Sequence, residues 1–327
     1  MPKPAELFAI GQDLGGTNIV TAAYSSLRGI LIRSKIPSLV QEGQRSVLTR
    51  MAHEARKVRA LSGLPLRRFK ALGIGSPGPL DSERGLVLAT PNLKGWRKVP
   101  VAARLGRATG LKAWLDNDAR CAALGEFRRG AGRGAKDLVI LTLGTGVGGG
   151  IIVGGRLIGG RTHTAGELGW SYLDPRGPRL EFGLPGSVES FASASAIARM
   201  ARAGATARRR GALWRLCQGR PQRITAKMAH QALKLGDASA KAAWAKAGWA
   251  LGVAIASYIN ALNPEKVVLA GGVMAGGGRE LLAIARRWAK AGAYPQPYNA
   301  CRILAAELGD DASVIGAAEM ALARSAA

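Results

Sequence analysis

The sequence runs twice from a short apolar strand into a glycine–threonine turn, once in each half of the chain. The first turn is Asp13-Leu14-Gly15-Gly16-Thr17-Asn18, and the second is Leu143-Gly144-Thr145-Gly146-Val147-Gly148-Gly149-Gly150. Glycine lets the backbone turn sharply so that its N–H groups point at a phosphate, and threonine adds a hydroxyl donor. Either turn taken alone is equally consistent with a plain hairpin. The repetition predicts two related α/β units with a cleft between them.

The remaining apolar periodicity predicts strands and helices that alternate along both halves. A chain of 327 residues favours two domains. We expect the smaller to span 1–118 plus about 312–327, and the larger 119–311. Expected strands are Phe8–Ile10, Ile19–Tyr24, Ala71–Ile74, Asp137–Leu143 and Lys266–Ala270, with a hairpin over Gly149–Ile158; expected helices are Arg45–Leu61, Ala119–Phe127, Ser239–Leu262 and Val314–Arg324.

A third glycine pair, Gly271-Gly272, also follows a predicted strand, where a base or ribose could lie close to the backbone. Three such loops favour nucleotide or phosphate binding over packing alone. The sequence contains no Gly-Lys dipeptide, which excludes a Walker A loop. A strand rather than a helix follows Gly146–Gly150, which argues against the dinucleotide fingerprint.

Carboxylates close to these turns are candidates for catalysis and metal binding. Asp118, in Asp116-Asn117-Asp118, lies where a strand leads into a helix. A sugar hydroxyl is a poor nucleophile, so a carboxylate is needed to accept its proton, and the Asn117 amide can both donate and accept. The alternative is a helix N-cap. Asp13 could hold the Mg²⁺ that phosphoryl transfer requires.

Two glutamates follow the second glycine turn. Glu167 lies in Ala165-Gly166-Glu167-Leu168-Gly169-Trp170, and Glu189 comes further along the chain. In a glycine-rich, otherwise apolar stretch, both could accept hydrogen bonds from neighbouring sugar hydroxyls. The alternative is a surface loop.

The charge balance is strongly basic, with 47 Lys and Arg against 21 Asp and Glu and a net charge of +26. Such a field attracts anions such as nucleotides, polyphosphate or nucleic acid. The alternative is a solvated basic surface without a partner. The cations form no single stripe and aromatic residues make up only 5%, which argues against a single-strand nucleic-acid platform.

Other features favour a cytoplasmic protein without a membrane span. The sequence has no apolar run near the roughly 20 residues that a spanning helix requires, and Met1–Glu6 does not have the pattern of a secretion signal. Three widely spaced cysteines fit a reducing compartment and argue against a disulfide framework.

The run from Gly144 to Gly169 closely resembles the signature of the ROK family, which contains bacterial glucokinases, fructokinases, N-acetylmannosamine kinases and sugar-responsive repressors. Asp13–Asn18 resembles the first phosphate loop of the family, and Asn117-Asp118 its sugar-binding pair. The resemblance extends over nearly the whole chain. It also includes the proline–glycine loop Gly75-Ser76-Pro77-Gly78-Pro79-Leu80-Asp81, the glucokinase-like segment Thr90-Pro91-Asn92-Leu93-Lys94-Gly95-Trp96, and the C-terminal stretch Leu308–Ala317.

This resemblance implies an actin-like, ribonuclease-H-like pair of α/β domains and a hexose kinase that uses Mg²⁺ and ATP, with glucose as the expected acceptor at its 6-OH. Asp118 would be the base, and a homodimer is implied. Polyphosphate is an alternative or additional donor that suits the basic charge. A repressor is disfavoured because the first phosphate loop begins too early for a preceding helix-turn-helix; a non-catalytic sugar sensor is the other alternative. The sugar contacts would be Gly75, Pro77, Gly78, Asn92, Asn117, Glu167 and Glu189, and the phosphate and nucleotide contacts Gly15, Gly16, Thr17, Gly144, Thr145, Gly146, Gly271 and Gly272.

One departure from the family concerns zinc. Members usually carry a zinc-binding His where this chain has Trp170, and thiolates where it has Leu180, Phe182 and Ser187. Tryptophan, leucine and phenylalanine cannot ligate zinc. We therefore expect no structural zinc, and packing of Trp170, Leu180 and Phe182 in its place. Trp170 is expected in the core, with stacking on a sugar face as the alternative.

Overall fold

The first half of the chain forms a five-stranded sheet. The computed structural model describes residues 5–88, 93, 95–179 and 184–326. Strands β1 (Phe8–Leu14), β2 (Asn18–Ser25) and β3 (Gly29–Pro37) form an antiparallel meander, while β4 (Phe69–Ser76) and β7 (Ala113–Asn117) add in parallel beside β1. The strand order is β3-β2-β1-β4-β7.

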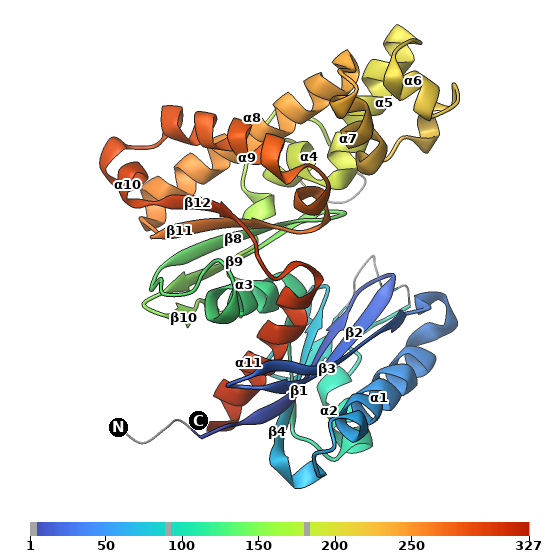
Figure 1. Ribbon diagram of the computed structural model, residues 1–327, viewed down its shortest axis with the longest axis vertical. Coiled ribbons are helices and arrows are strands. Elements are labelled where there is room, and N and C mark those ends of the chain that lie inside the picture. Colours follow the sequence, from blue (N-terminus) through green and yellow to red (C-terminus); the bar gives the residue numbers. More distant parts are fainter. Residues whose placement is uncertain (1–4, 89–92, 94, 180–183, 327) are drawn as a thin grey trace.

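The second half repeats this topology. Strands β8 (Leu138–Leu143), β9 (Val147–Val153) and β10 (Arg156–Leu157) are antiparallel, and β11 (Lys266–Ala270) and β12 (Arg302–Ala305) extend the sheet in parallel from β8. The order β10-β9-β8-β11-β12 matches that of the first sheet. The prediction of two related α/β units is confirmed, and Figure 1 shows the two sheets one above the other.

Two helices cross between the sheets and connect the units. Helix α3 (Asp118–Arg129) leads out of β7 and packs on β8 and β9, and α11 (Ala312–Ala326) returns to pack on β1 and β4. The two helices also pack on each other (Figure 1). Their contact is tight because each carries a glycine there. A Cβ built on Gly316 would lie 1.7 Å from the Cys121 carbonyl oxygen, and one on Gly125 would lie 2.0 Å from that of Ala312.

The outer faces of the sheets are covered by helices. Helices α1 (Gly43–Leu61) and α2 (Val101–Thr109) pack on the first sheet, and α8 (Ala238–Leu262) with α9 (Gly272–Gly292) lies over the second. Between β10 and β11 the chain adds a helical region, drawn at the far end in Figure 1. It contains α4 (Val188–Ala192), α5 (Ala194–Arg208), α6 (Ala212–Leu216) and α7 (Ala226–Lys234). Smaller elements are the hairpin β5 (Leu80–Asp81) and β6 (Leu86–Val87), and α10 (Pro295–Ala300).

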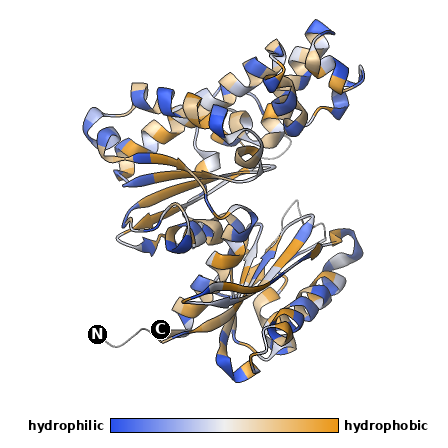
Figure 2. Ribbon diagram, in the orientation of Figure 1, coloured by the Kyte–Doolittle hydropathy of each residue, from blue (hydrophilic) through white to orange (hydrophobic). Residues whose placement is uncertain are grey.

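Apolar residues concentrate in the strands and on the inner faces of the helices, while the outer helix faces carry polar residues (Figure 2). Each sheet therefore carries its own core, one centred on residues such as Ile10 and Leu72, the other on Leu141 and Leu269. In the part of the chain that the structure describes, no helix combines the length and apolar character needed to cross a bilayer.

Candidate active site

A cleft of about 630 Å³ lies at the ends of the strands that carry the glycine turns. The β1–β2 turn and the β8–β9 turn both line it, so segments about 130 residues apart in sequence meet there. The first turn is indeed a hairpin, with the Gly15 N–H donating to the Asn18 carbonyl at 2.9 Å, and it is also a cleft wall. Predicted residues that line the cleft are Gly15, Gly16, Thr17, Pro77, Gly78, Asn117, Asp118, Gly144, Thr145, Gly146, Glu167, Glu189 and Gly271.

Asp118 is the first residue of α3 and lines the cleft. The N-cap is its neighbour Asn117, whose Oδ1 accepts from the N–H groups of Ala119 at 2.9 Å and Arg120 at 3.2 Å. The Asp118 carboxylate also accepts from the Ala119 N–H at 2.8 Å, through Oδ1. Burial raises the pKa of Asp118, although hydrogen bonds from the backbone oppose the shift. The cap is therefore made by Asn117, and the half-buried Asp118 carboxylate lines the cleft.

In the structure, one end of the Asn117 amide is already occupied by the helix cap. We expected its amide both to donate to and to accept from sugar hydroxyls. Because Oδ1 accepts two helix N–H groups, the part of the amide that is available to a ligand is the Nδ2 donor, which lies beside Gly78.

Asp13 lies behind the cleft wall, beside Gly75 of β4. Its Oδ1 accepts a hydrogen bond from Ser313 Oγ at 2.7 Å. Burial and the nearby Asp118 carboxylate raise the pKa of Asp13 to about 7. Two neighbouring carboxylates in a buried place repel each other, and a divalent cation relieves such repulsion. The donor chemistry at Asp13 therefore fits Mg²⁺.

Glu189, at the start of α4, packs against the second glycine turn. One carboxylate oxygen, Oε2, accepts from the Val147 N–H at 2.7 Å, and a Cβ on Gly146 would lie 2.3 Å from the same oxygen. Glycine at 146 is thus required for this close approach. Burial raises the pKa of Glu189, and the Val147 N–H opposes the shift. Glu189 therefore both contacts the second glycine turn and lines the cleft.

Glu167 also lines the cleft, just before the short helix Leu168–Trp170. Its pKa is raised by burial and by the carboxylates of Asp118 and Glu189, while Arg120 lowers it. A second hollow of about 520 Å³ adjoins the cleft here and shares Gly78, Asn117, Glu167 and Trp170 with it. The carboxylates of Asp118, Glu167 and Glu189, which all line this cleft, are suited to accepting hydrogen bonds from a polyhydroxylated ligand.

The expectation of a core position for Trp170 is wrong. Trp170 is 46% exposed and lines both the cleft and the adjoining hollow. Its neighbour Gly169 packs directly against the Val147 carbonyl, so the chain turns there and directs position 170 outward. Leu180 and Phe182, the other members of the expected packing cluster, lie outside the described residues.

The remaining predicted residues differ in their placement. Gly75 is buried and Asp13 lies behind the wall, so neither is among the residues lining the cleft; nor is Gly272, which begins α9 beside Gly271. Asn92 lies outside the described residues. The sequence analysis did not single out Thr142 or Arg120, which line the cleft and the adjoining hollow respectively. Thr142 could have been predicted as a cleft residue, because it is a threonine near a strand end just before a glycine turn.

Comparison with known proteins agrees with this geometry. The model of the ROK family matches residues 9–324. The chain belongs to the ROK family. It is 36% identical over 320 residues to a glucokinase of Thermotoga maritima, with 98% of each chain covered.

Solved ROK structures have the same architecture. A glucokinase from Streptomyces griseus in complex with glucose and AMPPNP superposes with a TM-score of 0.82 at 30% identity, covering 97% of this chain and 99% of the other. A ROK hexokinase from Thermus thermophilus gives a TM-score of 0.80 at 32% identity over the same shares. The predicted actin-like, ribonuclease-H-like fold is confirmed.

Proposed function

We propose that this ROK protein is a hexose kinase that transfers the terminal phosphoryl group of ATP to a hexose, with the 6-OH of glucose as the acceptor. The observation that carries the proposal is one cleft that a half-buried carboxylate, Asp118, lines together with two glycine–threonine turns. The relatives named glucokinase or hexokinase, and the glucose and AMPPNP bound in one of them, support it.

The cleft residues fall into two groups, those that bind the hexose and those that bind the phosphoryl donor. Asp118 accepts the proton of the attacking hydroxyl. The Asn117 amide, Glu167, Glu189 and the Pro77-Gly78 turn hold the other hydroxyls, and we retain Gly75 as the support of this side and Asn92 as a further contact. Backbone N–H groups of Gly16 and Gly146, with the Thr17 and Thr145 hydroxyls, stabilise charge on the phosphates. Gly15 and Gly144 shape these two phosphate turns, because their own N–H groups donate within the turns at 2.9 Å. Gly271 and Gly272 lie on the base and ribose side.

Asp13 would hold the Mg²⁺ together with the donor phosphates. When bound, the ion neutralises charge on the transferring phosphoryl group. Ser313 keeps the Asp13 carboxylate in place through its 2.7 Å hydrogen bond.

We further propose that hexose binding draws the two domains together, which excludes water as a competing acceptor. The moving parts would be residues 1–118 with about 312–327 on one side and 119–311 on the other. On the resemblance to the family, we also propose a cytoplasmic homodimer. Because Trp170 stands where members of the family carry a zinc-binding His, we propose that this chain has no structural zinc.

The pH dependence of turnover tests the role of Asp118. Its base function requires the carboxylate form, and burial raises its pKa, so activity is lost on acidification at a higher pH than for an ordinary aspartate. We expect the acid limb of kcat/KM for the hexose to lie clearly above the usual aspartate pKa of about 3.9. The pKa values of Asp13, Glu167 and Glu189 are also raised, so the acid limb reports the titration of these interacting carboxyl groups together and not of Asp118 alone. Circular dichroism at each pH separates this loss from acid unfolding; an acid limb at or below the ordinary value would contradict the prediction.

The donor is tested by comparing ATP with inorganic polyphosphate, the alternative that the net charge of +26 favours. Product formation from a panel of hexoses is measured with each donor at low and high ionic strength. We expect ATP to support turnover of glucose. We also expect any KM for polyphosphate to rise with salt more steeply than the KM for ATP, because salt screens the attraction between the basic protein and a long polyanion more than its attraction to a single nucleotide. No product with either donor would refute the kinase and favour a sugar sensor. A salt-independent KM for polyphosphate would refute the electrostatic role.

A further inference from the structure

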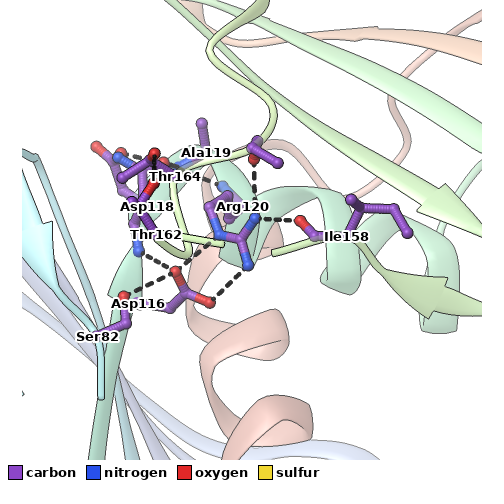
Figure 3. Close-up of polar contacts among 10 residues, drawn as sticks. Ser82, Asp116, Asp118, Ala119, Arg120, Ile158, Thr162 and Thr164 are labelled. Carbon is purple, nitrogen blue, oxygen red and sulfur yellow. Dashed lines mark hydrogen bonds and ion pairs between the residues drawn. The ribbon is translucent and has the colours of Figure 1, made fainter. Parts of the chain in front are cut away.

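Arg120 forms a buried ion pair two residues after Asp118, in the first turn of α3. Its Nε donates to Asp116 Oδ1 at 2.8 Å, and its Nη2 donates to Asp116 Oδ2 at 3.3 Å (Figure 3). The two side chains are only 7% and 4% exposed. Asp116 is the second-to-last residue of β7, and its Oδ1 also accepts from the Asn117 N–H at 2.8 Å and from Ser82 Oγ at 3.4 Å. The guanidinium is thus fixed against the strand that presents Asn117 and Asp118.

The other side of the same guanidinium holds a loop. Nη1 donates to the Ile158 carbonyl at 2.5 Å and to the Ala165 carbonyl at 2.8 Å (Figure 3). These carbonyls lie at the two ends of the loop 158–165, which leads directly into Glu167. Four of the five N–H groups of Arg120 are therefore engaged, two with β7 and two with this loop.

The loop has little regular structure of its own to fix its position. Within 158–165, Gly160 and His163 have positive φ angles of 65° and 57°. The other contacts made by its side chains are near the surface, such as the exposed His163 Nε2–Glu83 Oε1 pair at 2.8 Å. Surface pairs contribute little to stability. The two bonds from Arg120 are the stronger restraint because they are charge-assisted and come from a side chain that is almost fully buried.

We propose that Arg120 is a positioning residue for the hexose: it holds the loop 158–165 against β7, and so sets the spacing between Glu167 and Asp118. This inference rests on the proposed kinase function. Both carboxylates would contact the same small ring, so a shift of either degrades hexose binding, while the glycine turns that hold the donor are left in place. Arg120 also keeps positive charge near Glu167, which favours its hydrogen-bond-accepting carboxylate form.

The test is Arg120→Lys, because an ammonium can pair with Asp116 but cannot reproduce the planar fork that reaches two further carbonyls. We expect the KM for glucose to rise by about tenfold or more, with the KM for ATP changed by less than about twofold. Turnover at saturating glucose should fall less than kcat/KM.

Arg129→Lys is the matched control. Arg129 lies in the last turn of the same helix, pairs with Glu319 at 3.3 Å and donates to the Ser26 carbonyl and to Tyr24 Oη. It contacts neither the cleft nor the loop 158–165 in the described part of the chain. We expect it to lower the thermal midpoint without changing the KM for glucose.

If Arg120→Lys does not fold, the double variant Asp116→Asn with Arg120→Gln replaces it. This variant exchanges the ion pair for two neutral side chains and leaves no unpaired buried charge. The same rise in the KM for glucose is expected. An unchanged KM for glucose, or equal changes in both KM values, would overturn the positioning role even though the wild type remains an active kinase. A wild type without hexose turnover would instead refute the proposed function itself.

Discussion

Asp118→Asn is expected to lower kcat for hexose phosphorylation by about 10³-fold or more, while the hexose still binds. The amide has nearly the same shape as the carboxylate but cannot accept the hydroxyl proton. Local structure should persist, because Asn117 provides the cap of α3 and the amide oxygen at 118 can still accept from the Ala119 N–H. The loss would therefore report on proton transfer.

Initial rates with glucose and ATP, together with calorimetric titration of glucose, provide the measurement. Glu307→Gln is the matched control, since it makes the same carboxylate-to-amide change at an exposed side chain that pairs with Arg133. Turnover of this control should stay within about twofold of the wild type. A comparable turnover in Asp118→Asn would remove Asp118 from the mechanism.

Gly316→Ala should destabilise the fold by about 3 kcal/mol, near the upper end of overpacking effects. The added methyl group would lie 1.7 Å from the Cys121 carbonyl oxygen, so α3 and α11 must separate. Backbone atoms of a packed helix cannot move aside as the end of a flexible side chain can. Because Asp118 begins α3, activity should fall at temperatures where the fold still persists.

Chemical denaturation measures this loss of stability. Gly276→Ala is the control, because Gly276 lies on an exposed part of α9 where the closest atom to a built Cβ, His230 Nδ1, is 4.0 Å away. Alanine favours a helix by up to about 1 kcal/mol over glycine, so this variant should be equal to or more stable than the wild type. Equal midpoints for the two alanine variants would show that the helix contact is not tight.

The elements next to the cleft could be predicted from the sequence because local signals define them. β11 has the predicted bounds, Lys266–Ala270, since an apolar run is enclosed by Pro264 and Gly271. The hairpin β9–β10 turns at Gly154-Gly155, as the glycine pair indicated. The cleft residues at both glycine turns were found by the same strand-then-glycine pattern.

Long-range packing was beyond what the sequence predicts. The crossing of α3 with α11 joins residues nearly 200 positions apart, and no local pattern encodes that pairing. The apolar character of Trp170 predicts a core position. Its exposure instead follows from the packing of Gly169 against Val147. No local pattern in the sequence distinguishes Arg120 from the other arginines, because only the fold brings the carbonyls of Ile158 and Ala165 close to it.

A crystal structure of the protein with glucose, Mg²⁺ and a non-hydrolysable ATP analogue would test the central claim most directly. We expect one Asp118 carboxylate oxygen within hydrogen-bond distance, about 2.6–3.2 Å, of the hydroxyl that faces the terminal phosphate. That phosphate should lie against the turns at Gly15–Thr17 and Gly144–Gly146. A glucose hydroxyl in line with the phosphate but remote from Asp118, or a glucose bound outside the cleft, would contradict the account.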